Sequence, residues 1–132
     1  PKFMRQGDIY ISASSSEGFG LPLLHSMALG IPVITVRFGG ALEFAQPQYC
    51  TYIEPRGYQT VTDMDGIPQF KNCIWPTLRV SDIKDAMRDV WSNYSNAKSK
   101  ALKAYEYVHN TYTYKQIGPK MIEAINSVRN KL

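Results

Sequence analysis

The sequence predicts an α/β fold in which a parallel β-sheet is flanked by helices. Residues 8–14 and 32–36 are short runs rich in β-branched and aromatic side chains, which is typical of strands. Residues 21–29, between them, have the length and apolar spacing of a short helix. Strand, helix and strand within about 30 residues form a βαβ unit, whose strands are parallel and whose crossover is right-handed.

The ends of the expected helix, 21–29, carry residues that suit helix termini. Pro22 stands near its start, where a missing N–H group removes no helical hydrogen bond. Gly30 follows its end, where glycine readily adopts a left-handed cap. The strand at 32–36 is almost wholly apolar, so we expect it to be buried on both faces of the sheet.

The middle of the chain is less regular. After a break at Gly39-Gly40, we expect a short helix over residues 41–45 and a strand over residues 49–53. Residues 55–73 are interpreted as a surface insertion that forms a small hairpin, because Asp-Gly is a strong turn signal. Its two strands and its turn are expected at residues 59–62, 69–73 and 63–66.

Three helices are expected from Ser81 onward. Ser81 is a good N-cap, and Asp82 in the first turn suits the helix dipole. The second helix spans about residues 95–109 and the third about 117–131, where Gly118-Pro119 should kink or delay the start. Their apolar stripes, expected in the core, are Ile83, Met87, Val90, Trp91 and Tyr94; Ala97, Ala101, Ala104, Tyr105 and Val108; and Ile117, Met121, Ala124, Ile125 and Val128.

Composition places the chain among globular proteins. With 132 residues, 44% of them hydrophobic, it can form one domain with a core and is not a disordered chain. No apolar run approaches the length that spans a bilayer, and no signal peptide is recognised. The net charge of +4 is a mild excess that suits phosphorylated ligands without requiring them. The first residue is Pro1 rather than Met, which suggests a part of a longer protein.

Cysteine and histidine spacing predicts neither a disulfide framework nor a metal site. Cys50 and Cys73 form no CxxC pair, so we expect a reducing compartment, with a single Cys50–Cys73 bridge left open. Together with His25 and His109 they lack zinc-ligand spacing. Nine tyrosines and a pI near 9.1 raise nucleic-acid binding as a hypothesis. Most tyrosines fall at expected core positions or in the insertion, which disfavours it.

The stretch from Ser14 to Leu24 carries the chemistry. A strand ends, a glycine-flanked turn follows and a helix begins, and ligands of open α/β sheets bind outside the carboxyl ends of the strands. The helix's first N–H groups have no partner within it and suit a phosphate or a sugar hydroxyl. Gly18 and Gly20 allow close backbone approach to a ligand. Glu17 adds a carboxylate that accepts hydrogen bonds from paired hydroxyls.

Each of these signals has a structural alternative when taken alone. The glycines could be turn residues, Glu17 a capping acid and Phe19 a core residue. Glu17 also has no obvious partner acid, so a glycoside-hydrolase pair is not predicted.

Taken together, the motif residues resemble the large family-four retaining glycosyltransferases, the glycosyl transferases group 1. The matching elements are Ser14, Glu17 to Pro22, Gly30 with Pro32-Val33, Gly39-Gly40 with Glu43, and Ile74-Trp75-Pro76 followed by Val80 to Ile83. The resemblance implies a partial Rossmann-like parallel sheet with flanking helices, the C-terminal half of a GT-B donor lobe. Residues 1–112 would belong to that lobe, and 113–132 would form a helix crossing toward an N-terminal lobe outside this chain.

The resemblance also implies a role for each matched position. The donor sugar would be held by Glu17, Gly18, Phe19 and Gly20. The nucleotide and its diphosphate would be bound by Leu21, His25, Gly39 and Gly40. For Glu43 a structural role that orders the turn is favoured.

Two departures from the family pattern stand out. His25 occupies the position of a second glutamate that usually holds the ribose; it could contact the nucleotide in another way or merely pack. The family's phosphate-binding Arg and Lys lie well upstream, and Lys2 and Arg5 are too near Glu17 to be that pair. The first half of the lobe and the acceptor lobe, with its catalytic histidine, are therefore expected outside this chain. His109 is no substitute, so no catalytic residue is assigned here.

The implied function is transfer of a sugar, with retention, from a GDP- or UDP-hexose to an acceptor hydroxyl. Cofactors and metals are not expected. The partners would be the nucleotide-sugar donor and, through the absent lobe, a glycan, lipid or protein acceptor. We expect a cytoplasmic protein, with peripheral membrane contact left open and no nucleic acid bound. The alternative is a non-catalytic module that binds a nucleotide sugar or a glycan.

Overall fold

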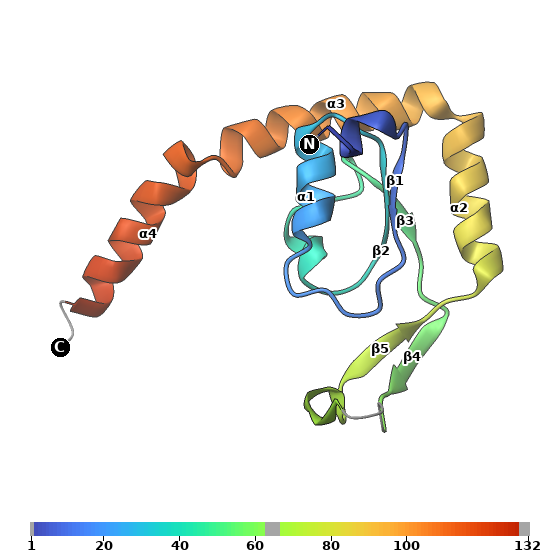
Figure 1. Ribbon diagram of the computed structural model, residues 1–132, viewed down its shortest axis with the longest axis horizontal. Helices are drawn as coiled ribbons and strands as arrows, with labels where there is room; N and C mark the ends of the chain where they lie inside the picture. The colour runs from blue at the N-terminus through green and yellow to red at the C-terminus, as the bar shows by residue number, and fades with distance from the viewer. Residues whose placement is uncertain (1, 63–66, 130–132) are drawn as a thin grey trace.

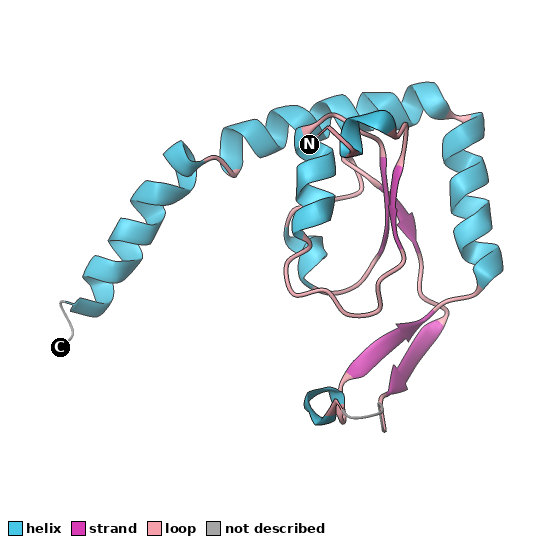
Figure 2. Ribbon diagram, viewed as in Figure 1, coloured by secondary structure: helices cyan, strands magenta, loops and turns pink. Residues whose placement is uncertain are grey.

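The computed structural model describes residues 2–62 and 67–129. A small three-stranded sheet lies at its centre, with helices against it, a hairpin projecting from one end and a long helix leaving the body (Figures 1 and 2). Strands β1 (Tyr10–Ser12), β2 (Val33–Val36) and β3 (Thr51–Ile53) pair in parallel in the order β1-β2-β3. The predicted parallel α/β fold is confirmed, although each strand is shorter than expected.

The βαβ unit is built as the sequence indicates. Helix α1 (Leu21–Ala28) connects β1 to β2, and Gly30 after it has a φ of 65°, in the left-handed region. All four residues of β2 are buried, because this central strand is covered on both faces. The helix expected at 41–45 is a 3-10 turn, η2 (Gly40–Glu43). A further 3-10 turn, η1 (Met4–Gln6), precedes β1.

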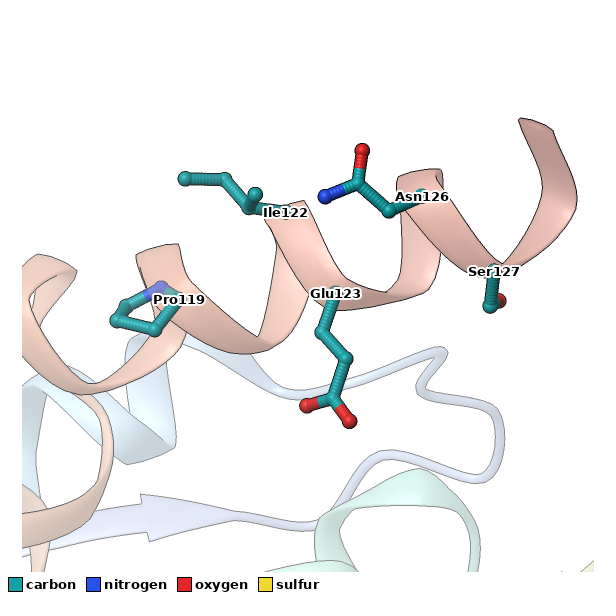
Figure 3. A pocket seen from close by; sticks show the side chains of 5 residues that line it. All are labelled: Pro119, Ile122, Glu123, Asn126 and Ser127. Carbon is teal, nitrogen blue, oxygen red and sulfur yellow. The ribbon is translucent and has the colours of Figure 1, made fainter. Parts of the chain in front are cut away.

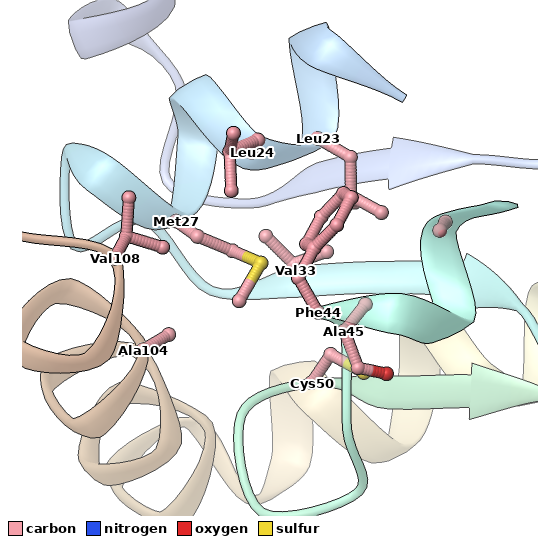
Figure 4. Close-up of a cluster of buried hydrophobic side chains, with 10 residues drawn as sticks. Leu23, Leu24, Met27, Val33, Phe44, Ala45, Cys50, Ala104 and Val108 are labelled. Carbon is pink, nitrogen blue, oxygen red and sulfur yellow. The ribbon is translucent and has the colours of Figure 1, made fainter. Parts of the chain in front are cut away.

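Successive residues of β2 supply two separate cores, since side chains alternate between the faces of a strand. Val33 points to the core between α1 and α3 (Tyr94–Thr111), drawn in Figure 4. Ile34 points to the opposite core under α2 (Val80–Ser92). The first core holds Leu23, Leu24, Met27, Val33, Phe44, Ala104 and Val108, and the second Ile34, Ile53, Val90 and Ala97.

A hairpin extends from the carboxyl end of the sheet (Figure 1). Strands β4 (Gly57–Thr60) and β5 (Ile74–Thr77) are antiparallel. The prediction of a second strand at 69–73 is wrong: η3 (Pro68–Phe70) and a left-handed Asn72, with a φ of 67°, occupy that stretch and delay the strand. The Asp-Gly turn predicted at 63–66 lies outside the described residues. Pro76 is tolerated in β5 because a two-stranded ribbon leaves one edge of each strand unpaired.

The helix boundaries differ from the prediction at two places. Helix α2 begins at Val80, so the prediction of Ser81 as N-cap is wrong; Asp82 instead accepts a hydrogen bond from the N–H of Arg79 at 3.2 Å. Helix α4 (Tyr114–Arg129) begins before Pro119 and continues through it, so the predicted delay is also wrong. No described residue of α4 is buried, because the helix runs away from the sheet (Figure 1).

The predicted stripe of α2 is rotated from the one that packs. Val90 is buried with Ile83 and Ala86 beside it, whereas Met87 is 48% and Trp91 76% exposed. The small Ala86 lies on the side of α2 that packs against this core, and the larger Met87 and Trp91 lie on the neighbouring, exposed side. In α3 the expected alanines and Val108 are buried, but Tyr105 is exposed. The whole stripe predicted for α4 is wrong as a core stripe.

Candidate functional site

The loops after β1 and β2 meet at one edge of the sheet, because the carboxyl ends of parallel strands lie together. Between them is a hollow of about 20 Å³. A volume of that size accepts roughly one water molecule. A larger ligand would therefore lie across its mouth, against the exposed residues 16–19. The residues around the hollow include Tyr10, Ser12, Ser14, Glu17, Gly20 and Phe38.

The start of α1 opens toward this hollow. Gly20 is the N-cap, with φ 90° and ψ 46°, and no side chain caps the helix. The helical ladder begins with the Leu24 N–H, which donates to the Gly20 oxygen at 3.0 Å. The N–H groups of Leu21 and Leu23 precede that ladder, and Pro22 has none. Leu21 is 54% exposed, so the helix start is reachable from solvent and favours an anionic group there.

The loop that carries Glu17 rests directly on the double glycine after β2. A Cβ on Gly40 would lie 1.9 Å from the carbonyl oxygen of Gly18. The Gly40 N–H donates to the Glu17 oxygen at 3.4 Å, and Gly39 has a φ of 76°. The two loops thus touch backbone to backbone, which only glycine permits. The structure places Gly39 and Gly40 behind the loop; their contact with a diphosphate stays a prediction.

The carboxylate of Glu17 is exposed beside the phenol of Tyr10. The pKa of Tyr10 is raised, mainly by burial and further by the charge of Glu17, so the phenol keeps its proton. An exposed carboxylate can accept hydrogen bonds, and a neighbouring phenol can donate one. The Ser14 hydroxyl makes a hydrogen bond within its own loop, since its Oγ donates to the Ser16 carbonyl oxygen at 2.9 Å.

Phe19 was interpreted from the sequence either as a core residue or as part of the donor-sugar site, and its surroundings have features of both. Its ring centroid lies 5.1 Å from that of Phe44 and 6.3 Å from that of Tyr112. The side chain is still 40% exposed, so one part of it faces solvent beside Glu17. Contact of Phe19 with a sugar stays a prediction.

His25 lies on the exposed side of α1, one turn beyond Leu21, and does not line the hollow. Its proposed contact with a nucleotide is neither supported nor contradicted by the geometry. Glu43 lies in η2, where its charge contributes to a raised pKa of Tyr112, after burial and the Tyr107 hydroxyl.

Other candidate groups lie away from this edge. Within residues 2–62 and 67–129 no cluster of three potential metal ligands occurs. Cys50 and Cys73 are free thiols, so the bridge left open by the sequence is not formed. Burial raises the pKa of Cys50 to about 12. The Nδ1 of His109 lies 2.9 Å from the Tyr105 oxygen of its own helix.

A larger hollow, of about 600 Å³, follows α4 (Figure 3). Its lining residues, among them Pro119 and Glu123, come from that one helix. A single helix cannot surround a ligand, and the strand ends contribute nothing to this hollow. The edge with Glu17 is therefore the better candidate.

Sequence reasoning missed three contributors to the site. Tyr10 and Phe38 line the hollow, and Tyr112 supports Phe19. The contribution of Tyr10 could have been predicted, since it alternates with Ile9 and Ile11, which pack on the core under α2, in the strand that leads to the motif. No local signal connects Tyr112 to a loop some 90 residues earlier in the chain.

Residues 1–62 match the family model described as "Glycosyl transferases group 1". The chain is 28% identical over 106 residues to "Putative glycosyltransferase 48" of Sulfolobus islandicus filamentous virus, covering 76% of this chain and 32% of that protein. It is 40% identical over 62 residues to "O-antigen biosynthesis glycosyltransferase WclY" of Escherichia coli, covering 47% of this chain and 17% of that protein.

Among solved structures, sucrose-phosphate synthase from Thermosynechococcus elongatus is similar, with a TM-score of 0.74 and 16% identity. The likeness covers 98% of this chain and 27% of that one, and it shows the GT-B glycosyltransferase fold. This chain spans less than a third of the length of each of these proteins. In the part of the chain that the structure describes, no helix is long and apolar enough to cross a bilayer.

Proposed function

We propose that this chain, whose residues 1–62 match the glycosyl transferases group 1 family model, is the donor-binding segment of a glycosyltransferase. The donor would be a nucleotide-diphosphate hexose, with GDP or UDP as the nucleotide. The sugar would pass to an acceptor hydroxyl, with retention at the anomeric carbon.

One observation carries this proposal: Glu17 and the start of α1 line one hollow at the carboxyl edge of a parallel sheet. A carboxylate suits the paired hydroxyls of a hexose, and free helix amides suit a phosphate. A nucleotide sugar has both groups, joined at the anomeric carbon.

The proposed contribution to catalysis is electrostatic. As the bond to the anomeric carbon breaks, negative charge grows on the diphosphate, and amides at a helix N-terminus stabilise it without reorganising. We propose that no metal and no further cofactor is needed at this edge. Cationic side chains would come from the upstream half of the same lobe, and the acceptor site from a second lobe, which would also determine any membrane contact.

A substitution at Glu17 tests the proposal. In the full-length protein, Glu17→Gln keeps the size of the side chain and removes its charge. Transfer from UDP-glucose and GDP-mannose should fall roughly 10- to 100-fold, because hydrogen bonds to a charged group are worth about 1.5–3 kcal/mol. Glu54→Gln is the matched control, since Glu54 is an exposed acid after β3 at the same edge, 3.3 Å from Arg37. It should change transfer less than about two-fold.

Unchanged transfer in Glu17→Gln would contradict the role of that carboxylate. His25, at the position where the family has a glutamate, favours one competing function, a module that binds donors without transferring sugar. Calorimetry with UDP, GDP and their hexose derivatives separates the two. Binding that Glu17→Gln weakens, with no transfer to any acceptor in a broad panel, would favour the module.

A further inference from the structure

Three aromatic rings connect the Glu17 loop to the junction between α3 and α4. Phe19 lies on the loop, Phe44 follows η2, and Tyr112 is the residue directly after α3. The centroids are 5.1 Å apart for Phe19–Phe44, 6.3 Å for Phe19–Tyr112 and 6.1 Å for Phe44–Tyr112. The two contacts of Tyr112 are edge-on, at 60° and 70°, an arrangement that aromatic pairs favour. We call these three residues the aromatic brace.

One side of the brace is fixed and the other is not. Phe44 is fully buried, and the Tyr112 N–H donates to the Val108 oxygen at 2.8 Å. The Tyr112 ring also meets the Tyr107 ring edge-on, with centroids 5.7 Å apart. In contrast, residues 16–19 of the loop are all exposed. The brace is therefore the place where a side chain of this exposed stretch reaches the buried core.

The brace also lies where the direction of the chain changes. Helix α3 ends at Thr111 and α4 starts at Tyr114, so Tyr112 occupies the short connection between two long helices. Beyond it, α4 leaves the body of the molecule (Figure 1).

We propose that Tyr112 is a positioning residue for the candidate donor site: through Phe19 it orders the Glu17 loop. Tyr112 touches no ligand in this scheme. Its effect on a nucleotide sugar rests on the proposed function, whereas its effect on the loop does not. The Tyr112 hydroxyl stays protonated in its buried surroundings, since its pKa is raised by burial and by the Tyr107 hydroxyl, so the ring carries no charge into the core.

Amide hydrogen exchange on the full-length protein tests the inference without a ligand. Tyr112→Leu keeps an apolar side chain but removes all three edge-on ring contacts, and Tyr112→Phe keeps the ring. Tyr49→Leu is the matched control: Tyr49 is half-buried at the same core and stacks on Tyr107 at 4.6 Å and 13°, without a ring contact to Phe19. Exchange of the Gly40 amide, which donates to the Glu17 carbonyl oxygen and so reports on the loop, should rise about ten-fold in Tyr112→Leu, equivalent to ~1.4 kcal/mol of lost loop stability.

The other variants decide between positioning and general packing. In Tyr112→Phe and Tyr49→Leu, exchange of the Gly40 amide should stay within about two-fold of wild type. A folded Tyr112→Leu with unchanged exchange of the Gly40 amide, or an equal rise in Tyr49→Leu, would overturn the inference. If Tyr112→Leu does not fold, Phe19→Leu replaces it, since Phe19 is partly exposed and its loss should again raise exchange of the Gly40 amide selectively.

A second measurement separates this inference from the proposed function. UDP and GDP are titrated into the wild type and into Tyr112→Leu, and the dissociation constant of whichever binds should rise about ten-fold while Tyr112→Phe restores it. A wild type that binds neither nucleotide, with loop exchange still dependent on Tyr112, would contradict donor binding and support the positioning role. Wild-type nucleotide affinity in a variant with a loosened loop would overturn the link from Tyr112 to the donor site.

Discussion

Replacing Gly40 by alanine should displace the Glu17 loop. The new Cβ would lie 1.9 Å from the Gly18 carbonyl oxygen and 2.9 Å from its carbonyl carbon. Carbon and oxygen atoms in contact normally lie about 3.3 Å or more apart, so one backbone must move by roughly 1.4 Å. Neither atom belongs to a flexible side chain, and the strain cannot be relieved by a change of rotamer.

The energetic consequence follows from that geometry. Overpacking typically costs about 1–3 kcal/mol, and a clash between two backbones belongs at the upper end, near 3 kcal/mol. For a domain of this size such a loss corresponds to a fall in melting temperature of about 10 °C. Circular dichroism melting of Gly40→Ala and the wild type measures it.

Gly18→Ala provides the control at the other side of the same contact. A Cβ on Gly18 meets no atom within 4 Å, and its φ is not among the positive values. Its melting temperature should therefore change by less than about 2 °C. If the backbone of Gly18 approaches a sugar, Gly18→Ala should still weaken donor binding. A Gly40→Ala protein as stable as wild type would refute the packing argument.

Two further predictions concern groups outside the candidate site. A thiol reagent at pH 8 should modify Cys73, which is half-buried, and spare Cys50, because burial raises the pKa of Cys50 to about 12. Of these two thiols, one should therefore react in the native protein and both in denaturant. Reaction of both in the native protein would contradict the prediction. The pKa of Asp82 is lowered, first by its hydrogen bond from Arg56, so the stability it contributes is present above its unfolded pKa near 4 and is lost as pH falls through the lower folded value. The urea midpoint of unfolding should therefore fall further from pH 7 to pH 3 in the wild type than in Asp82→Asn. Equal falls in the two proteins would show that the Arg56–Asp82 pair does not contribute to stability.

Much of the candidate site could be predicted because its signals are local. The apolar run that became β2, Pro22 at a helix start and Gly30 beyond its end each affect their own few residues, and the structure confirms the elements they indicate. The position of Glu17 follows in the same way, because a loop that leaves a parallel strand and enters a helix must lie at the carboxyl edge.

The C-terminal half was harder to predict because periodicity shows which face is apolar but not what covers it. Trp91 and Met87 share the predicted stripe with Val90, yet Val90 is buried in the core under α2 while Met87 is 48% and Trp91 76% exposed. Gly118-Pro119 was expected to kink or delay the start of the last helix, but α4 begins at Tyr114 and continues through Pro119, and none of its described residues is buried.

The sequence by itself determined the βαβ unit, the glycine-rich turn and the carboxylate at its mouth, because backbone propensities and chain connectivity act over a few residues. The tertiary structure alone decided that Gly40 presses on Gly18 and that Tyr112 supports Phe19. These contacts join segments more than 20 and more than 90 residues apart, and no local pattern encodes a distance between them. They arise only when the sheet and its helices have fixed where each loop can lie.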